Sequence, residues 1–106
     1  MVSVDASDRQ LDETLTVAPH VHWQRFDNEL VVLDLKASEY LGMNEVAADA
    51  FERLALGKSL RMVIRELSSI YDVDIARVQV DVVQLVAELV SAGLLLGHRS
   101  IAPIDQ

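Results

Sequence analysis

The spacing of apolar residues divides the chain into a strand-rich first half and a helical second half. In residues 20–26, His20, His22 and Gln24 alternate with Val21, Trp23 and Arg25, as the two faces of a half-buried strand do. Leu30–Leu35 is a short apolar run rich in branched side chains, and Tyr40–Met43 resumes an extended pattern after a polar break. Two apolar runs about four residues apart predict a hairpin, so residues 17–43 predict a small three-stranded antiparallel sheet.

The second half of the chain predicts three amphipathic helices, because its apolar residues recur at intervals of about three and four. The expected helices span residues 45–56, 60–71 and 75–92. Before each helix stands a residue whose side chain can accept a hydrogen bond from the first turn. These N-caps are Asn44, Ser59 and Asp74, and Gly57 and Gly93 are expected to end the first and third helices. The fold class is therefore α+β, with a three-stranded sheet followed by three helices.

The third helix carries more apolar surface than a helix on the outside of a small domain needs. At about 100° per residue, its apolar side chains fall on two stripes rather than one. The first stripe holds Val78, Val82, Leu85, Val86 and Leu89, and the second holds Val80, Val83, Ala87 and Val90. Three interpretations stay open: the rest of the domain covers both stripes, one stripe lines a groove for a partner, or one stripe forms a homodimer contact.

The strand expected at Tyr40–Met43 lies at an edge of the sheet, where backbone N–H and C=O groups lack partners. It contains no proline to block pairing, and Gly42 adds no side-chain bulk. An extended peptide can add to such an edge as a further strand. The alternative is an ordinary edge that is kept short against aggregation.

Composition and charge narrow the classes of function. The chain has 106 residues, the size of one domain. Its 9 Lys and Arg against 17 Asp and Glu give a formal charge of -8, which disfavours nucleic acids and anionic membranes as partners. Cysteine is absent, which excludes disulfides, thiolate catalysis and cysteine-ligated metals. The sequence shows no secretory signal and no apolar run of about 20 residues, so the expected location is the cytoplasm.

Two histidines are the candidates for a metal site. His20 and His22 stand two positions apart on one face of the first expected strand, a spacing that can hold a metal. No third ligand lies near them in the sequence, since His98 is in the tail, and a metal site needs ligand count as well as spacing. We expect no metal, no other cofactor and no catalytic residue, because no catalytic motif is present either.

Four cations gather around the turn between the first two expected helices. These residues are Arg53, Lys58, Arg61 and Arg65. They could bind the phosphates of DNA or an acidic surface of a protein partner, or they could simply be solvent-exposed charges with no partner molecule. The third helix, which would read the bases, offers Arg77 beside Asp81 and Glu88, and carboxylates facing phosphates disfavour DNA.

The sequence resembles the PqqD family over about residues 31–95, well over half of the chain. The resemblance rests on Val31–Leu35, on Tyr40–Glu45 with small residues following, and on Asp81 in a last helix that leads to Leu89–Leu95. It implies a winged helix-turn-helix-like fold and recognition of the leader region of ribosomally made precursor peptides. The pattern departs from the family at Met43, where leucine is usual, and both ends of the chain lie outside it.

The resemblance also implies a docking mode, in which the leader adds as a strand beside the third strand and against the third helix. The residues expected to bind the peptide are Tyr40, Leu41, Gly42, Met43, Val80, Val83, Gln84 and Ala87. The pattern is most similar to stand-alone members of lasso-peptide pathways. Further partners would then be a cysteine peptidase that removes the leader and a cyclase that acts afterwards.

The expected organisation is a flexible acidic arm over residues 1–16, a peptide-recognition domain over 17–96 and a tail over 97–106. The expected function is that of a non-catalytic adaptor, which binds a leader peptide and delivers it to modifying enzymes. A winged-helix DNA-binding regulator and a dimerisation module are the alternatives, and the sequence leaves the oligomeric state open.

Overall fold

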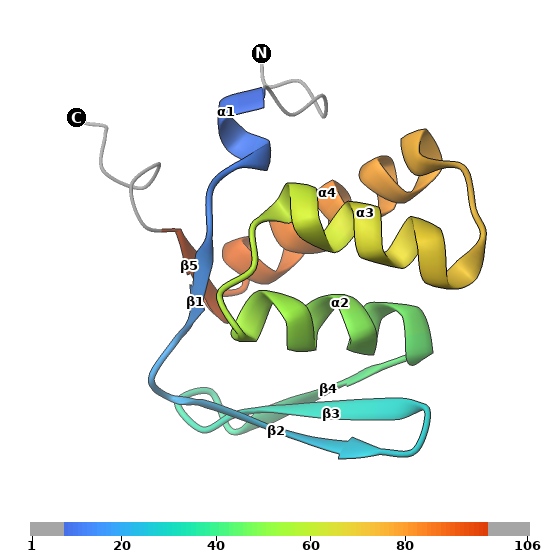
Figure 1. The fold of residues 1–106 in the computed structure, drawn as a ribbon. Coiled ribbons are helices and arrows are strands. Elements are labelled where there is room, and N and C mark those ends of the chain that lie inside the picture. The colour runs from blue at the N-terminus through green and yellow to red at the C-terminus, as the bar shows by residue number, and fades with distance from the viewer. Residues whose placement is uncertain (1–7, 98–106) are drawn as a thin grey trace.

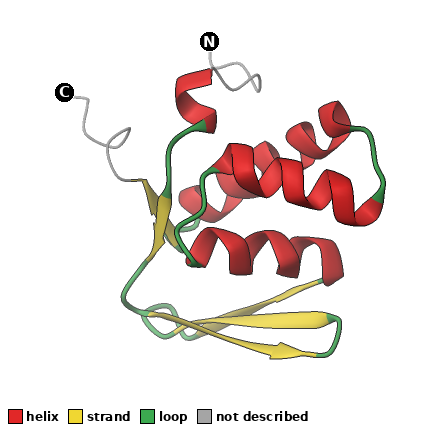
Figure 2. Ribbon diagram, viewed as in Figure 1, coloured by secondary structure: helices red, strands yellow, loops and turns green. Residues whose placement is uncertain are grey.

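The computed structural model describes residues 8–97, whose helices and strands are drawn in Figures 1 and 2. In chain order the elements are α1 (Asp8–Leu11), β1 (Leu15–Val17), β2 (Val21–Phe26), β3 (Glu29–Asp34), β4 (Glu39–Met43), α2 (Glu45–Ala55), α3 (Leu60–Tyr71), α4 (Ile75–Ser91) and β5 (Leu95–Gly97). The expected sheet corresponds to β2, β3 and β4, and the expected helices correspond to α2, α3 and α4. The α+β prediction is therefore confirmed.

The main sheet is antiparallel with the order β2-β3-β4, so β2 and β4 are its edges. Leu30 and Val32 of β3 are buried, whereas Leu33 on the opposite face is 40% exposed. The buried face packs on α2, and the views show no helix on the other face of the sheet (Figures 1 and 2). The alternation along β3 thus turns one face of the sheet towards the core, as period-two patterning requires.

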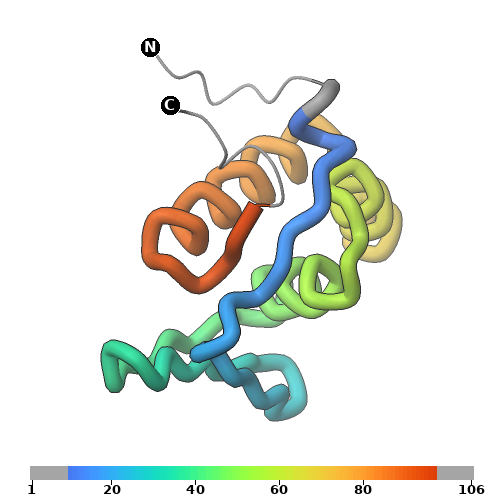
Figure 3. Tube along the Cα trace, turned by 90° about the vertical axis from the view of Figure 1, so that its left-hand side faces the viewer, coloured from blue at the N-terminus to red at the C-terminus, as the bar shows by residue number. Residues whose placement is uncertain are grey.

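Part of the segment that was expected to be a flexible arm, residues 8–16, packs against the domain. Leu11 and Leu15 are buried, and β1 pairs with β5 in a second, two-stranded sheet. Figure 3 shows the blue N-terminal segment beside the red β5. Burial of two leucines offsets part of the entropy that is lost when residues 8–16 are ordered. Residues 1–7 and 98–106, which include most of the expected tail, lie outside the described residues.

The expected capping residues set most of the helix boundaries. Asn44 Oδ1 accepts a first-turn N–H of α2 at 3.0 Å, and Ser59 Oγ accepts one of α3 at 3.2 Å. Asp74 stands at the N-cap position of α4, but its side chain makes no capping hydrogen bond. Gly57 and Gly93 have φ values of 92° and 79°, a left-handed conformation that favours glycine.

Helix α2 is the middle layer of the domain. It lies between the main sheet on one side and α3 and α4 on the other (Figure 2). Its Phe51 is fully buried and meets the ring of Trp23 from β2 edge-on, with ring centroids 5.3 Å apart. Buried leucines from all three long helices complete the core, namely Leu54, Leu67 and Leu89. The position of α2 therefore fixes where the sheet edge lies relative to the other helices.

Candidate functional site

The free edge of β4 is the first component of the site. β4 pairs with β3 on one side only, so one row of its backbone groups is unpaired within the described sheet. Tyr40 is 77% exposed and Leu41 is 43% exposed, and Gly42 is exposed with space around it. Met43 is only 5% exposed, because its side chain enters the core opposite Leu30. Tyr40–Met43 thus offer backbone pairing, whereas the side chain of Met43 is already used in packing.

A groove with a volume of about 580 Å³ opens between α2, α3 and α4 and begins next to β4. Asn44, the residue that follows β4, lines it, as do Val46, Ala47 and Ala50 of α2. The lining from α3, the following turn and α4 consists of Leu67, Tyr71, Val73, Arg77, Val78, Asp81, Val82 and Leu85. The walls are mostly apolar, and a concave apolar surface beside an open strand edge suits an extended peptide.

The two stripes of α4 have different environments. The first stripe faces the core, and its buried members are Val78, Val82 and Leu89. The second stripe is divided, because Val83 and Val90 pack half-buried against the core while Val80 is 53% exposed and Ala87 is exposed.

The expected contacts on α4 lie away from the groove. Val80, Val83, Gln84 and Ala87 do not line it, and Gln84 and Ala87 border a separate shallow depression with Glu88. The groove instead meets α4 on the flank of Arg77, Asp81 and Leu85. The structure therefore brings the β4 edge together with the first stripe and with a flank on which Arg77 and Asp81 form an ion pair at 3.7 Å.

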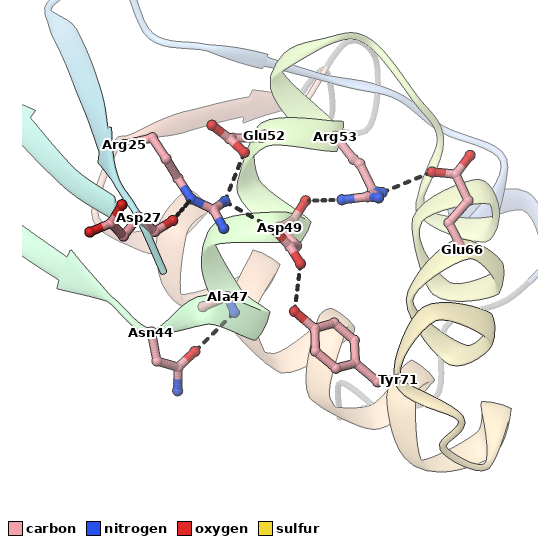
Figure 4. Close-up of polar contacts among 9 residues, drawn as sticks. All are labelled: Arg25, Asp27, Asn44, Ala47, Asp49, Glu52, Arg53, Glu66 and Tyr71. Carbon is pink, nitrogen blue, oxygen red and sulfur yellow. Dashed lines mark hydrogen bonds and ion pairs between the residues drawn. The ribbon is translucent and has the colours of Figure 1, made fainter. Parts of the chain in front are cut away.

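A polar network joins the groove to the sheet (Figure 4). The Tyr71 hydroxyl of α3 donates to Asp49 Oδ2 of α2 at 2.5 Å. Arg25 Nη1 of β2 donates to Asp49 Oδ1 at 3.0 Å and to Glu52 Oε1 at 2.8 Å. The Asp49 side chain is only 18% exposed, whereas those of Arg25 and Glu52 are 27% and 38% exposed, so the shielded member of the network is its central carboxylate.

The network shifts the pKa values of its members in opposite directions. Burial by itself would raise the pKa of Asp49, but hydrogen bonds from Tyr71 and Arg25 outweigh burial and hold this pKa below its ordinary value. The hydrogen bond to Asp49, with burial and the nearby negative charge, raises the pKa of Tyr71 to about 12. At neutral pH the pair is therefore a carboxylate accepting from a neutral phenol, which is a strong, charge-assisted hydrogen bond.

Three of the four cations between α2 and α3 have acidic partners. Arg53 Nε donates to Glu66 Oε1 at 2.9 Å, and Lys58 Nζ lies 2.9 Å from Glu66 Oε2. Arg61 Nε donates to Asp12 Oδ1 at 2.8 Å. These pairs reduce the positive charge that the cluster offers to phosphates, which weighs against nucleic-acid binding there.

Two other kinds of site can be examined in residues 8–97. His20 precedes β2 and lies 3.6 Å from Asp34, while His22 is exposed on the outer face of the sheet. No cluster of three or more potential metal ligands occurs among residues 8–97. Across the same residues, no helix has the length and apolar character needed to cross a membrane.

The sequence interpretation missed the groove flank and the polar network. Tyr71 packs half-buried against the core and also lines the groove, and the apolar spacing of its helix indicates only the first of these roles. Asp49 was not singled out at all. The signal that points to it is a lone acidic residue between Ala48 and Ala50, two small side chains that face the core.

Known proteins share both the sequence pattern and the fold. The family model described as Coenzyme PQQ synthesis protein D (PqqD) matches residues 29–95. The solved structure "TbiB1 in Complex with the TbiA(beta) Leader Peptide" has a TM-score of 0.75 at 25% identity and covers 80% of this chain and 99% of that chain. The structure "Lasso peptide synthetase B1 complexed with the leader peptide" has a TM-score of 0.72 at 30% identity and covers 77% and 96%. No curated protein sequence matches the chain.

Proposed function

This chain belongs to the PqqD family, and from that premise we propose that it is a non-catalytic adaptor that binds the leader region of a ribosomally synthesised precursor peptide. The observation that carries the proposal is the free edge of β4 beside an apolar groove. Support comes from two proteins of the same fold, each of which was solved as a complex with a leader peptide.

The leader binds as an additional strand along Tyr40–Met43. Backbone hydrogen bonds to this edge give affinity with little dependence on sequence, and side chains that enter pockets give specificity. Alternate residues of a strand point to opposite faces, so every second leader residue is directed towards the groove. The groove favours Asp81 and Leu85 as contacts on α4, and the expected contacts at Val80, Val83, Gln84 and Ala87 stay a prediction.

The affinity follows from opposing terms. Each apolar side chain that is buried in the groove contributes about 1.5–3 kcal/mol, and each backbone hydrogen bond adds about 0.5–1.5 kcal/mol. Ordering the leader and losing its free motion take back a large part of this gain. A dissociation constant between about 1 μM and some tens of nanomolar follows, which lets an adaptor release its peptide.

The further partners belong to the same pathway. We propose that the leader belongs to a lasso-peptide precursor. The enzymes that receive it are then a leader peptidase and a cyclase. The support is that one of the similar structures is described as a lasso peptide synthetase B1. The shielded acids and cations near the groove pair with one another, as Asp49 does with Arg25, which suits a binding surface more than a reaction centre.

A titration of this chain with fluorescein-labelled peptides tests the proposal. The probes are the leader and the core regions of a candidate precursor peptide, identified as a short reading frame beside this gene, and the readout is fluorescence anisotropy. We expect the leader to bind and the core region to bind far more weakly. Leader binding should change little with salt, whereas a DNA-binding regulator should hold duplex DNA and lose about 10³-fold or more in affinity between about 50 and 200 mM salt. Salt-sensitive, sequence-dependent DNA binding without leader binding would reverse the assignment.

A further inference from the structure

Tyr71 belongs both to the groove and to the polar network of Figure 4. Its side chain lines the groove from α3, while its hydroxyl donates to Asp49 of α2. Asp49 accepts in turn from Arg25, which extends from β2. One continuous series of hydrogen bonds therefore runs from the groove wall through α2 to the main sheet.

Leader binding depends on two distances, the one between α2 and α3 and the one between α2 and the main sheet, and this series of hydrogen bonds crosses both. The Tyr71–Asp49 bond ties α3 to α2, two of the helices that line the groove. The Arg25–Asp49 bond ties α2 to the sheet whose β4 edge pairs with the peptide. Other groove residues of α2 include Ala47 and Ala50, whose side chains have no polar group that could bond to α3.

The network has a cost that apolar packing would avoid. The Asp49 and Arg25 side chains are 18% and 27% exposed, and ionised groups lose hydration when they are shielded to this extent. Apolar residues of similar volume often stabilise a fold equally well or better. A charge-assisted hydrogen bond supplies something that apolar contacts do not, namely a fixed direction and distance between two groups.

From this geometry we infer that Tyr71 is a positioning residue that sets the width of the groove and so the size of the apolar leader side chain that fits it. The inference rests on the proposed function, because it requires a leader in the groove. The bond to Asp49 holds the Tyr71 ring in one place. A leader side chain that is too small then leaves contacts unmade, and one that is too large must displace the ring.

The same pair of helices offers a matched control. Arg53 of α2 donates to Glu66 of α3, and Lys58 pairs with the same carboxylate, so Glu66 also ties the two helices together. None of these three residues lines the groove. Glu66→Gln therefore weakens a polar tie between α2 and α3 away from the groove, whereas Tyr71→Phe removes the tie at the groove. Both substitutions keep the size of the side chain.

The experiment measures leader affinity and size discrimination in the parent, Tyr71→Phe and Glu66→Gln. The probes are the leader encoded beside this gene and a series in which each apolar leader residue is changed to alanine in turn. The position at which alanine weakens binding to the parent most is taken as the groove anchor. Circular dichroism first establishes that each variant is folded at the assay temperature. Asp49→Asn, which keeps an acceptor but removes the charge that Tyr71 and Arg25 share, serves as a second variant of the same series.

We expect Tyr71→Phe to bind the unmodified leader about 3- to 10-fold more weakly, the range of one lost hydrogen bond. In Tyr71→Phe, the loss of affinity that alanine causes at the anchor position of the leader should be at least about threefold smaller than in the parent. The reason is that the ring at position 71, no longer held by Asp49, can move into part of the space that the alanine leaves empty. Asp49→Asn weakens the bonds to both Tyr71 and Arg25, so it should lower the affinity and the anchor penalty at least as much as Tyr71→Phe does. Glu66→Gln should keep the affinity and the anchor penalty of the parent. The contrast between Tyr71→Phe and Glu66→Gln distinguishes positioning of the groove wall from a general loss of stability.

Three results would overturn the inference. If Tyr71→Phe binds every probe as the parent does, the hydroxyl does not position the groove. If Tyr71→Phe and Glu66→Gln weaken binding equally and leave the anchor penalty unchanged, the bond acts on stability alone. If the parent binds no leader, the proposed function fails and this inference fails with it.

Discussion

Aspartate substitutions at two half-exposed valines distinguish the groove from the outer side of α4 as the leader site. Val46 lines the groove in the first turn of α2 and is 45% exposed, while Val80 lies on α4 outside the groove and is 53% exposed. Each valine already contacts water, so both variants are expected to fold. An aspartate at position 46 also suits the positive N-terminal end of α2.

The expected loss of affinity can be worked from the exposure of Val46. Complete burial of a valine contributes about 1.5–3 kcal/mol. Because 45% of Val46 remains exposed in the free protein, a docked leader gains about 0.7–1.4 kcal/mol there. Desolvating an introduced carboxylate costs about 1–3 kcal/mol more. Val46→Asp should therefore weaken binding by about 2–4 kcal/mol, or roughly 30- to 700-fold, whereas Val80→Asp should stay within about twofold of the parent.

Fluorescence anisotropy with the labelled leader gives both dissociation constants, and thermal unfolding followed by circular dichroism shows whether each variant is folded. Val46→Asp should keep its Tm within a few degrees of the parent. If Val80→Asp loses the leader and Val46→Asp retains it, the leader lies on the outer side of α4, among the contacts expected from the family resemblance, and the reasoning from the groove is refuted.

Three further substitutions and conditions test the structure around the groove. Val83→Asp should lower the Tm by more than about 5 °C, because this half-buried side chain packs against the core; an unchanged Tm in thermal unfolding would contradict that packing. Asn44→Ala should lower the free energy of unfolding by about 1 kcal/mol in urea, whereas Asn44→Asp should retain it, because a carboxylate accepts the same first-turn N–H; an equal loss in both would argue against capping. The pKa of Tyr71 is raised to about 12 in the folded state, above about 10 when unfolded, so its contribution to stability is complete below about pH 10 and is lost as the pH rises towards 12. Urea unfolding of the parent and Tyr71→Phe should therefore converge over that range, and a constant difference would mean that Tyr71 does not titrate with folding.

The elements that could be predicted from the sequence are those with local signals. Asn44 and Ser59 begin α2 and α3 by accepting hydrogen bonds from backbone N–H groups within the next turn. Gly57 and Gly93 end α2 and α4 through their own backbone conformation. The apolar run of β3 identifies a strand without knowledge of its neighbours. Each of these signals involves residues close in sequence, where periodicity and capping rules apply.

The features that were missed depend on contacts between distant parts of the chain. The pairing of Leu15 with Gly97 joins short strands from opposite ends, and neither strand is long enough to show a period. The apolar positions of α4 were identified correctly, but which flank meets the groove depends on how the helix is rotated against α2 and α3. Periodicity gives the width of an apolar face and not the identity of the neighbour on either side of it. Leu85 and Asp81 line the groove, whereas Val80 and Val83, the contacts expected with the resemblance, lie outside it.

The open edge of β4 raises the question of what keeps it free, since an unpaired strand next to an apolar groove also invites a second copy of the chain. Natural edges are often blocked by proline, but proline here would also obstruct the leader, and β4 contains none. Charge offers protection without obstruction. Glu39, Glu45 and Asp81 are exposed close to the edge or the groove, and the whole chain carries a formal charge of -8. Repulsion between copies of so acidic a protein opposes self-pairing, while a leader that carries less negative charge approaches the same edge against a weaker barrier.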